Sequence, residues 1–171
     1  MTTLLFFKAN YRFLMFGLLL TLFSSLGQSF FYGLFKEDMR VSFGVTNTSF
    51  GSIYGLINVA SALCLMRVGR AIDHLPLQKF TTLSFLVLGA GCIIMSFAFA
   101  FPVFIAALFF TRFGGQGLFI HTNATSMGRY YHETRGRALA ITMLGLHFGG
   151  LTLPIIVVTL KKYLEWQQCW L

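Results

Sequence analysis

The residues best suited to chemistry lie in one apolar stretch, FIAALFFTRFGGQGLFIHTNA, at residues 104–124. At about 100° per helical residue, Arg112, Gln116 and Asn123 share one face. A guanidinium pairs with a carboxylate through two parallel hydrogen bonds, and amides add further polar contacts. We therefore expect this face to line a pathway for a small organic anion. The alternative is a structural arginine bonded to main-chain carbonyls, with the adjacent glycines permitting close helix packing.

Other apolar stretches carry polar residues at helical spacing. Gln28 shares a face with several hydroxyl residues, and Asn58 lies between Tyr54 and Ser61 on another face. We expect both faces to line the cavity of Arg112, and the alternative is interhelical hydrogen bonding of about 0.6 kcal/mol per pair. His147 lies near the middle of the last stretch. It could carry a coupling proton, or stay neutral and bonded to a carbonyl.

These stretches belong to a chain with the composition of an integral membrane protein. Of its 171 residues 56% are hydrophobic and only 11% are charged, and the mean hydropathy is +0.74. The net charge of +8 comes from short basic runs between apolar stretches, which argues against a nucleic-acid partner. Cys64, Cys92 and Cys169 lack metal-type spacing. We expect no metal, no cofactor, no catalytic residue and no enzymatic activity.

Five stretches are near the length of about 20 residues that crosses a bilayer. They lie at about 13–35, 48–66, 80–101, 103–127 and 137–160. Because only Phe101 and Pro102 separate the third stretch from the fourth, these two should form a tight antiparallel hairpin. Residues 166–171 would begin a sixth helix. The expected fold is an all-α membrane protein with five transmembrane helices, the start of a sixth, and lipid as its surroundings.

The basic residues predict the orientation of these helices. Eight of them fall on the side that contains the amino terminus and four on the other side, and basic residues favour the cytoplasm. We therefore expect a multi-pass protein of the cytoplasmic (inner) membrane with a cytoplasmic amino terminus. The first group is Lys8, Arg12, Arg67, Arg70, Lys79, Arg129, Arg135 and Arg137, and the second is Lys36, Arg40, Lys161 and Lys162.

Four motifs resemble those of the major facilitator superfamily, in matching order along the chain. The loop RVGRAIDHLPLQKF has the family's glycine, aspartate and basic residue at Gly69, Asp73 and Lys79. TRFGGQG resembles the helix-four pattern, RYYHETRGRALAI the loop from helix four into helix five, and EWQQCWL the entry to helix six. The first loop departs from the family pattern at four positions, namely His74, Pro76, Leu77 and Gln78.

The resemblance implies an N-terminal portion of a two-half secondary transporter that moves a small solute by alternating access. Residues 1–171 would be a partial N-terminal domain, and we expect a fragment that lacks its C-terminal half and is inactive alone. Gly69, Asp73 and Arg129 would form a cytoplasmic gate, weakened by the departures in the loop. A coupling proton could be carried by His147, by the substrate or by the missing half.

Two alternatives come from other classes of protein. His121 and His147 on neighbouring helices could ligate a haem in an electron carrier, but their depths differ by about 6 Å at 1.5 Å per residue. His121 also points about 180° away from Arg112. The second alternative is a membrane scaffold that transports nothing, which flux measurements in vesicles would distinguish from a carrier.

Overall fold

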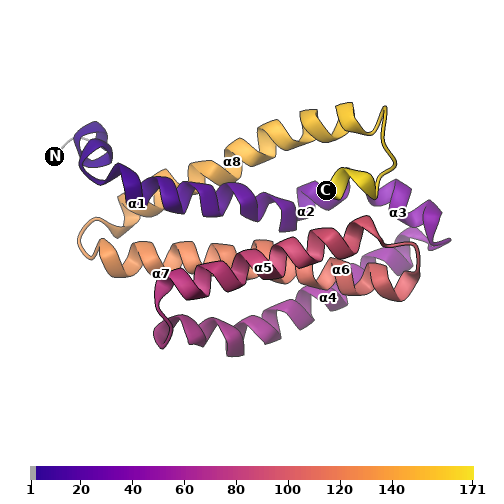
Figure 1. The fold of residues 1–171 in the computed structure, drawn as a ribbon, viewed down its shortest axis with the longest axis horizontal. Helices are drawn as coiled ribbons and strands as arrows, with labels where there is room; N and C mark the ends of the chain where they lie inside the picture. Colours follow the sequence, from indigo (N-terminus) through magenta and orange to yellow (C-terminus); the bar gives the residue numbers. More distant parts are fainter. Residues whose placement is uncertain (1–2) are drawn as a thin grey trace.

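The computed structural model describes residues 3–171, which are 84% helical and contain no strand. Five helical segments are long and apolar enough to cross a membrane, which confirms the expected fold class. These spans are Leu5–Gly33, Asn47–Asp73, Leu77–Ser96, Phe101–Tyr130 and Arg135–Leu160. In Figure 1 they run along the long axis of the molecule and reverse direction from each to the next.

The first span is interrupted twice. Helix α1 (Thr3–Ser24) bends at Asn10, whose side chain donates a 3.0 Å hydrogen bond to the carbonyl of Phe6. A 3-10 turn, η1 (Ser25–Gly27), then ends α1, and the extended residue Gln28 leads into the short helix α2 (Ser29–Gly33). The helix thus begins well before the expected position 13, because the apolar residues that precede the bend also pack: Phe6 is 4% exposed.

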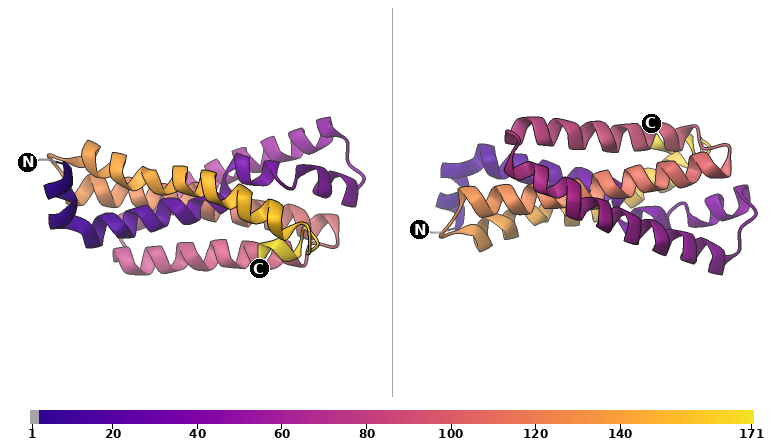
Figure 2. Two further views of the ribbon diagram at one scale, coloured as in Figure 1. Left: turned by 90° about the horizontal axis from the view of Figure 1, so that it is seen from above. Right: turned by 90° about the horizontal axis from the view of Figure 1, so that it is seen from below.

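The second and third spans and the start of the fourth follow along the chain. Helix α3 (Lys36–Ser42) turns the chain outside the spans, and α4 (Asn47–Val68) returns it to the turn η2 (Gly69–Asp73). Helix α5 (Leu77–Ser96) then pairs with α6 (Phe101–Arg112) in the expected hairpin. Figure 2 shows the fourth span between α4 and α5, both of which it contacts.

The fourth span changes its helical geometry halfway. Helix α6 continues into η3 (Phe113–Phe119), a π-helical segment, and then into α7 (Ile120–Tyr130). A π-helix bonds residue i to i+5, so it advances by a smaller angle per residue than an α-helix does. The glycines within this segment let the wide turn approach neighbouring backbones, and Gly115 packs directly against Gly27 of η1.

The last span, α8 (Arg135–Leu160), lies along α1. Thr21 Oγ1 donates a 2.5 Å hydrogen bond to the carbonyl of Thr142, and Gly145 faces the backbone of Leu18. After α8 the chain folds back to a 3-10 turn, η4 (Gln168–Trp170), at the position where the sequence predicted the start of a sixth helix. Trp170 is 6% exposed there, against aromatic side chains of α2.

Candidate functional site: a buried arginine between two broken helices

Arg112 is buried, with an exposed fraction of 7%, and three groups surround its guanidinium. Nη1 donates a 2.8 Å hydrogen bond to the carbonyl of Gly27, and Nε donates to Oδ1 of Asn58. The ring of Tyr54 faces the guanidinium carbon at 5.2 Å. Each partner is neutral, so the positive charge is solvated by dipoles and a π face rather than cancelled by an anion.

The carbonyl of Gly27 can accept this bond because α1 is broken there. In a continuous helix Gly27 would accept from the amide of Phe31, but that amide bonds to the carbonyl of Gln28. Main-chain groups freed inside a membrane protein need another partner, because unsatisfied polar groups are costly in lipid. Arg112 supplies it. The break in the first span and the arginine of the fourth therefore form one structural unit.

Arg112 borders a hollow of about 240 Å³ between α4 and the fourth span. Gln116, an exposed side chain one turn further along, and Asn58 also line it. The rest of the lining consists of small or aliphatic residues, namely Gly117, Ser61, Ala62 and Leu65. The structure thus brings together three of the predicted pathway residues, which supply one cation and two side-chain amides.

The remaining predicted pathway residues lie elsewhere. Gln28 and His147 share a separate, open hollow of about 560 Å³ between the first and last spans. Asn123 has no exposed surface and lies against Gly17 of α1, with its amide 3.9 Å from the sulfur of Met143. The π-helical segment between Arg112 and Asn123 rotates the second away from the face that a regular helix would give it.

The sequence also predicted a contact between the loop residue Asp73 and Arg129 at the end of the fourth span, and the structure contains it. Arg129 Nη2 forms an ion pair with Oδ1 of Asp73, and its Nη1 donates a 3.1 Å hydrogen bond to the carbonyl of Ile72. Both charged side chains are about half exposed, at 47% and 54%. Gly69 lies beside this pair, with its carbonyl 3.0 Å from Nε2 of His121. The pair joins η2 to the end of α7.

The histidines of the haem alternative lie in different environments. Nε2 of His121 forms a hydrogen bond with the carbonyl of Gly69, and the imidazole ring packs edge-on against Phe80 with ring centroids 6.4 Å apart. His147 faces the hollow of Gln28 on the other side of the bundle. Within residues 3–171, no group of three or more His, Cys, Asp or Glu side chains could hold a metal ion.

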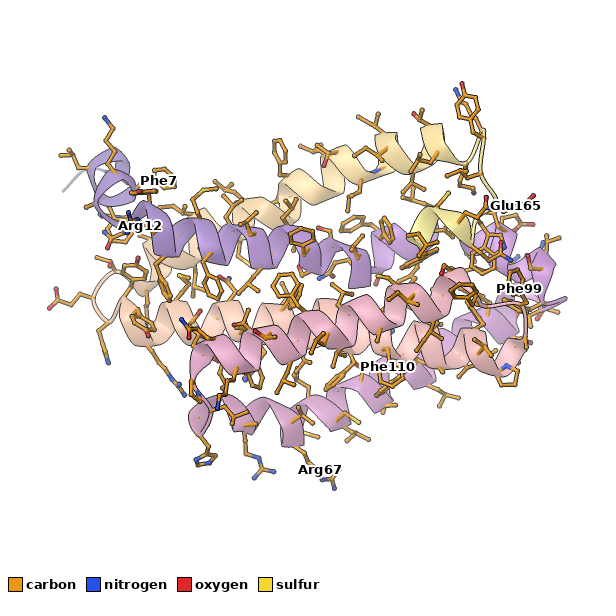
Figure 3. All side chains as sticks on the ribbon, viewed as in Figure 1. Phe7, Arg12, Arg67, Phe99, Phe110 and Glu165 are labelled. Atoms are coloured by element: carbon orange, nitrogen blue, oxygen red, sulfur yellow. The ribbon has the colours of Figure 1, made fainter. Side chains whose placement is uncertain are left out.

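The end of the bundle opposite the Asp73–Arg129 pair carries its own charges. Lys161 forms an ion pair with Asp38 and donates a 3.0 Å hydrogen bond to the carbonyl of Leu34. These contacts join the end of α8 to the segment around α3. Arg40 hydrogen-bonds to Glu37 at 2.5 Å and thereby lowers the pKa of this carboxyl. In Figure 3 Arg12 lies at the end with the amino terminus, and Glu165 lies at this opposite end.

The missed feature of the site is a main-chain atom. The sequence left main-chain carbonyls open as alternative partners of Arg112 but did not identify which one, and the structure shows that Nη1 donates to the carbonyl of Gly27 at 2.8 Å. A carbonyl has no signature in residue type. The signal available was a glycine next to Gln28 in a stretch otherwise typical of a continuous helix, and this pattern is weak evidence for a break.

The fold and the site define a class of protein: a multi-pass α-helical membrane protein with a buried cation beside a polar hollow. Comparison with family models identifies the family. The model of the Major Facilitator Superfamily matches residues 17–171, so the chain belongs to that superfamily, whose members are transporters rather than enzymes. Searches of curated proteins and of solved structures found no significant match.

Proposed function

We propose that this domain belongs to a secondary transporter of small organic anions and that Arg112 binds the anionic group. The observation that supports this most is a buried guanidinium held by three neutral partners at the wall of a hollow. A charge inside a membrane protein is costly and usually marks a substrate or ion pathway. A carboxylate would give this cation the counter-charge that its present partners lack.

Arg112 can hold a carboxylate without losing its structural partner. Each terminal nitrogen of a guanidinium has two hydrogens, so Nη1 and Nη2 can pair with the two carboxylate oxygens while Nη1 keeps its bond to the carbonyl of Gly27. Asn58 and Gln116 could then donate their amide hydrogens to the remaining acceptor positions of the carboxylate. Alternating access would follow if this binding favours one arrangement of two halves over the other.

Binding of a labelled carboxylate tests this proposal. Radiolabelled benzoate has a single carboxylate on a small rigid body, and benzamide is a neutral molecule of nearly the same shape. We expect the chain in lipid nanodiscs to bind benzoate saturably and in competition with other carboxylates, but not with benzamide. Saturable binding that Arg112→Leu leaves unchanged, or equal competition by benzamide, would refute the anion site.

We further propose that the amino terminus is cytoplasmic, that a C-terminal half completes the transport path, and that the Asp73–Arg129 pair is part of a cytoplasmic gate. Eight basic residues on the amino-terminal side support this orientation. The ion pair ties η2 to α7 within this domain, so it would shape the surface that meets a second half. His147 remains the candidate for a coupling proton, through the hollow it shares with Gln28.

Asp73→Asn tests the gate in a protein that carries both halves. An exposed pair contributes about 0.2–1 kcal/mol, which corresponds to a change of roughly 1.4-fold to fivefold in the ratio of two conformations. We therefore expect a larger inward-open population and slower transport, with normal insertion. Labelling of a cysteine placed at the cytoplasmic mouth reports this population.

Glu133→Gln is the matched control for Asp73→Asn, because Glu133 is an exposed acid in the loop that follows α7. It removes the same charge at the same end of the bundle and should leave the labelling unchanged. Equal labelling rates in Asp73→Asn and the parent protein would make Asp73 an ordinary loop residue.

A further inference from the structure

A second hollow, of about 230 Å³, lies between α2 and α4 toward the end of the bundle that carries α3. Its walls are mainly aromatic and small, from Tyr32, Phe50, Tyr54, Gly33 and Gly51. Two groups add polarity, the hydroxyl of Ser29 and the side chain of Lys36, which is exposed and begins α3. The hollow thus combines an apolar interior with a cation at its edge.

The aromatic walls are held in place by hydrogen bonds that leave the hollow open. Tyr32 donates from its hydroxyl to Oγ1 of Thr111 at 2.7 Å, which ties α2 to the fourth span. Tyr54 donates to Oγ of Ser29 at 2.9 Å, which ties α4 to the start of α2. The two tyrosine rings also meet edge to face at 5.6 Å. These contacts orient the two rings so that the hollow fits a flat apolar group.

Tyr54 connects this hollow to the site of Arg112. Tyr54 lines the hollow of Lys36, and its ring also covers the guanidinium carbon of Arg112 at 5.2 Å. Along α4, Asn58 follows one turn later and lines the hollow of Arg112. Lys36 therefore borders one hollow and Arg112 the other, and Tyr54 contacts both the first hollow and the guanidinium of Arg112.

We propose that the hollow of Lys36 is an outer binding station for an organic carboxylate with an aromatic or other flat apolar body. Lys36 pairs with the carboxylate, the rings of Tyr32 and Tyr54 contact the apolar body, and Tyr54 must move before the anion reaches Arg112. The station fits this chemistry because its aromatic walls can bury the apolar body of the ligand, while the ammonium of Lys36 at its edge attracts the carboxylate. Its role as an entrance rests on the proposed anion pathway at Arg112.

Benzoate binding to the chain with Arg112→Leu isolates the outer station. We expect this variant to keep weak, saturable binding of radiolabelled benzoate, and adding Lys36→Gln should reduce the affinity by up to about fivefold, the contribution of an ion pair to an exposed lysine. Lys36→Arg should preserve it. Lys162→Gln, an exposed lysine at the same end of the bundle that does not line the hollow, is the matched control.

Tryptophan emission locates the bound anion. The chain has two tryptophans, and Trp170 stacks on Tyr32 with ring centroids 5.8 Å apart. Benzoate at the outer station should therefore change the emission of the Arg112→Leu variant, and Lys36→Gln should suppress this change. Benzamide should produce no component that depends on Lys36.

The outcomes for the outer station and for Arg112 are distinguishable. If the Arg112→Leu variant shows no residual benzoate binding, or residual binding that is equal with and without Lys36, the outer station is refuted. A loss of the tight component on Arg112→Leu would still support the inner site in either case. Conversely, binding that depends on Lys36 alone would support the station and refute Arg112 as the anion site.

Discussion

Arg112→Lys is expected to weaken benzoate binding about 10- to 100-fold, although it keeps the positive charge. Lysine is a point charge on a flexible stem and cannot present the planar pair of donors that a carboxylate matches. The loss of one bond to a charged group, about 1.5–3 kcal/mol, sets this range. Arg112→Leu should abolish the tight component, and in a protein with both halves it should abolish transport. Equilibrium binding in nanodiscs and uptake into proteoliposomes measure the two effects.

Arg67→Leu is the matched control for this experiment, because it removes an arginine whose side chain points away from the bundle in Figure 3. It should leave benzoate binding unchanged. Arg112→Leu also removes a charge from the membrane interior, and the insertion of such a charge costs roughly 2.5–3.5 kcal/mol on insertion scales. We therefore expect it to insert at least as well as the parent, so that lost binding reflects lost chemistry. Tight binding that survives both Arg112 substitutions would place Arg112 among the packing residues.

The five spans were predictable because they depend on length and apolarity, two properties that are read directly from the chain. The hairpin of α5 and α6 followed from the short join expected between them, since so short a join leaves no other arrangement. The position of the join was wrong: it lies at residues 97–100, and Phe101 and Pro102 begin α6, where proline is favoured in the first turn. The contact of Asp73 with Arg129 followed from the resemblance to a family, which placed the loop of Asp73 and the end of the fourth span at one end of a bundle. None of these three results required knowledge of side-chain packing.

The arrangement around Arg112 was less predictable because it depends on irregular backbone. A helical wheel puts Asn123 beside Arg112 and Gln116, but this assumes a constant angle per residue. The π-helical turn of Phe113–Phe119 violates that assumption and buries Asn123 against α1. The bond to Gly27 depends in turn on the break at Ser25–Gly27, where tertiary contact with the fourth span replaces a helical hydrogen bond.

The close contact between these two irregular segments makes Gly115 sensitive to added volume. A Cβ atom on Gly115 would lie 2.7 Å from both Cα and N of Gly27, and 3.1 Å from the carbonyl oxygen of Ser24. All three are backbone atoms, so no side chain can rotate away to make room. The fourth span would have to separate from η1, and Arg112 would lose the carbonyl of Gly27.

Gly115→Val is therefore expected to destabilise the chain by about 1–3 kcal/mol, the usual range for overpacking, and to weaken benzoate binding as well. Gly128→Val, in α7 of the same span, is the matched control. A Cβ atom at that position would lie in open space, with no neighbouring atom within 4 Å, so this change should be nearly neutral. Thermal unfolding followed with a thiol-reactive dye can report both, because the free cysteines Cys64, Cys92 and Cys169 are all partly buried. Equal unfolding temperatures for the two variants would show that η1 and η3 do not pack as closely as the structure has them, and the bond from Arg112 to Gly27 would then lose its structural basis.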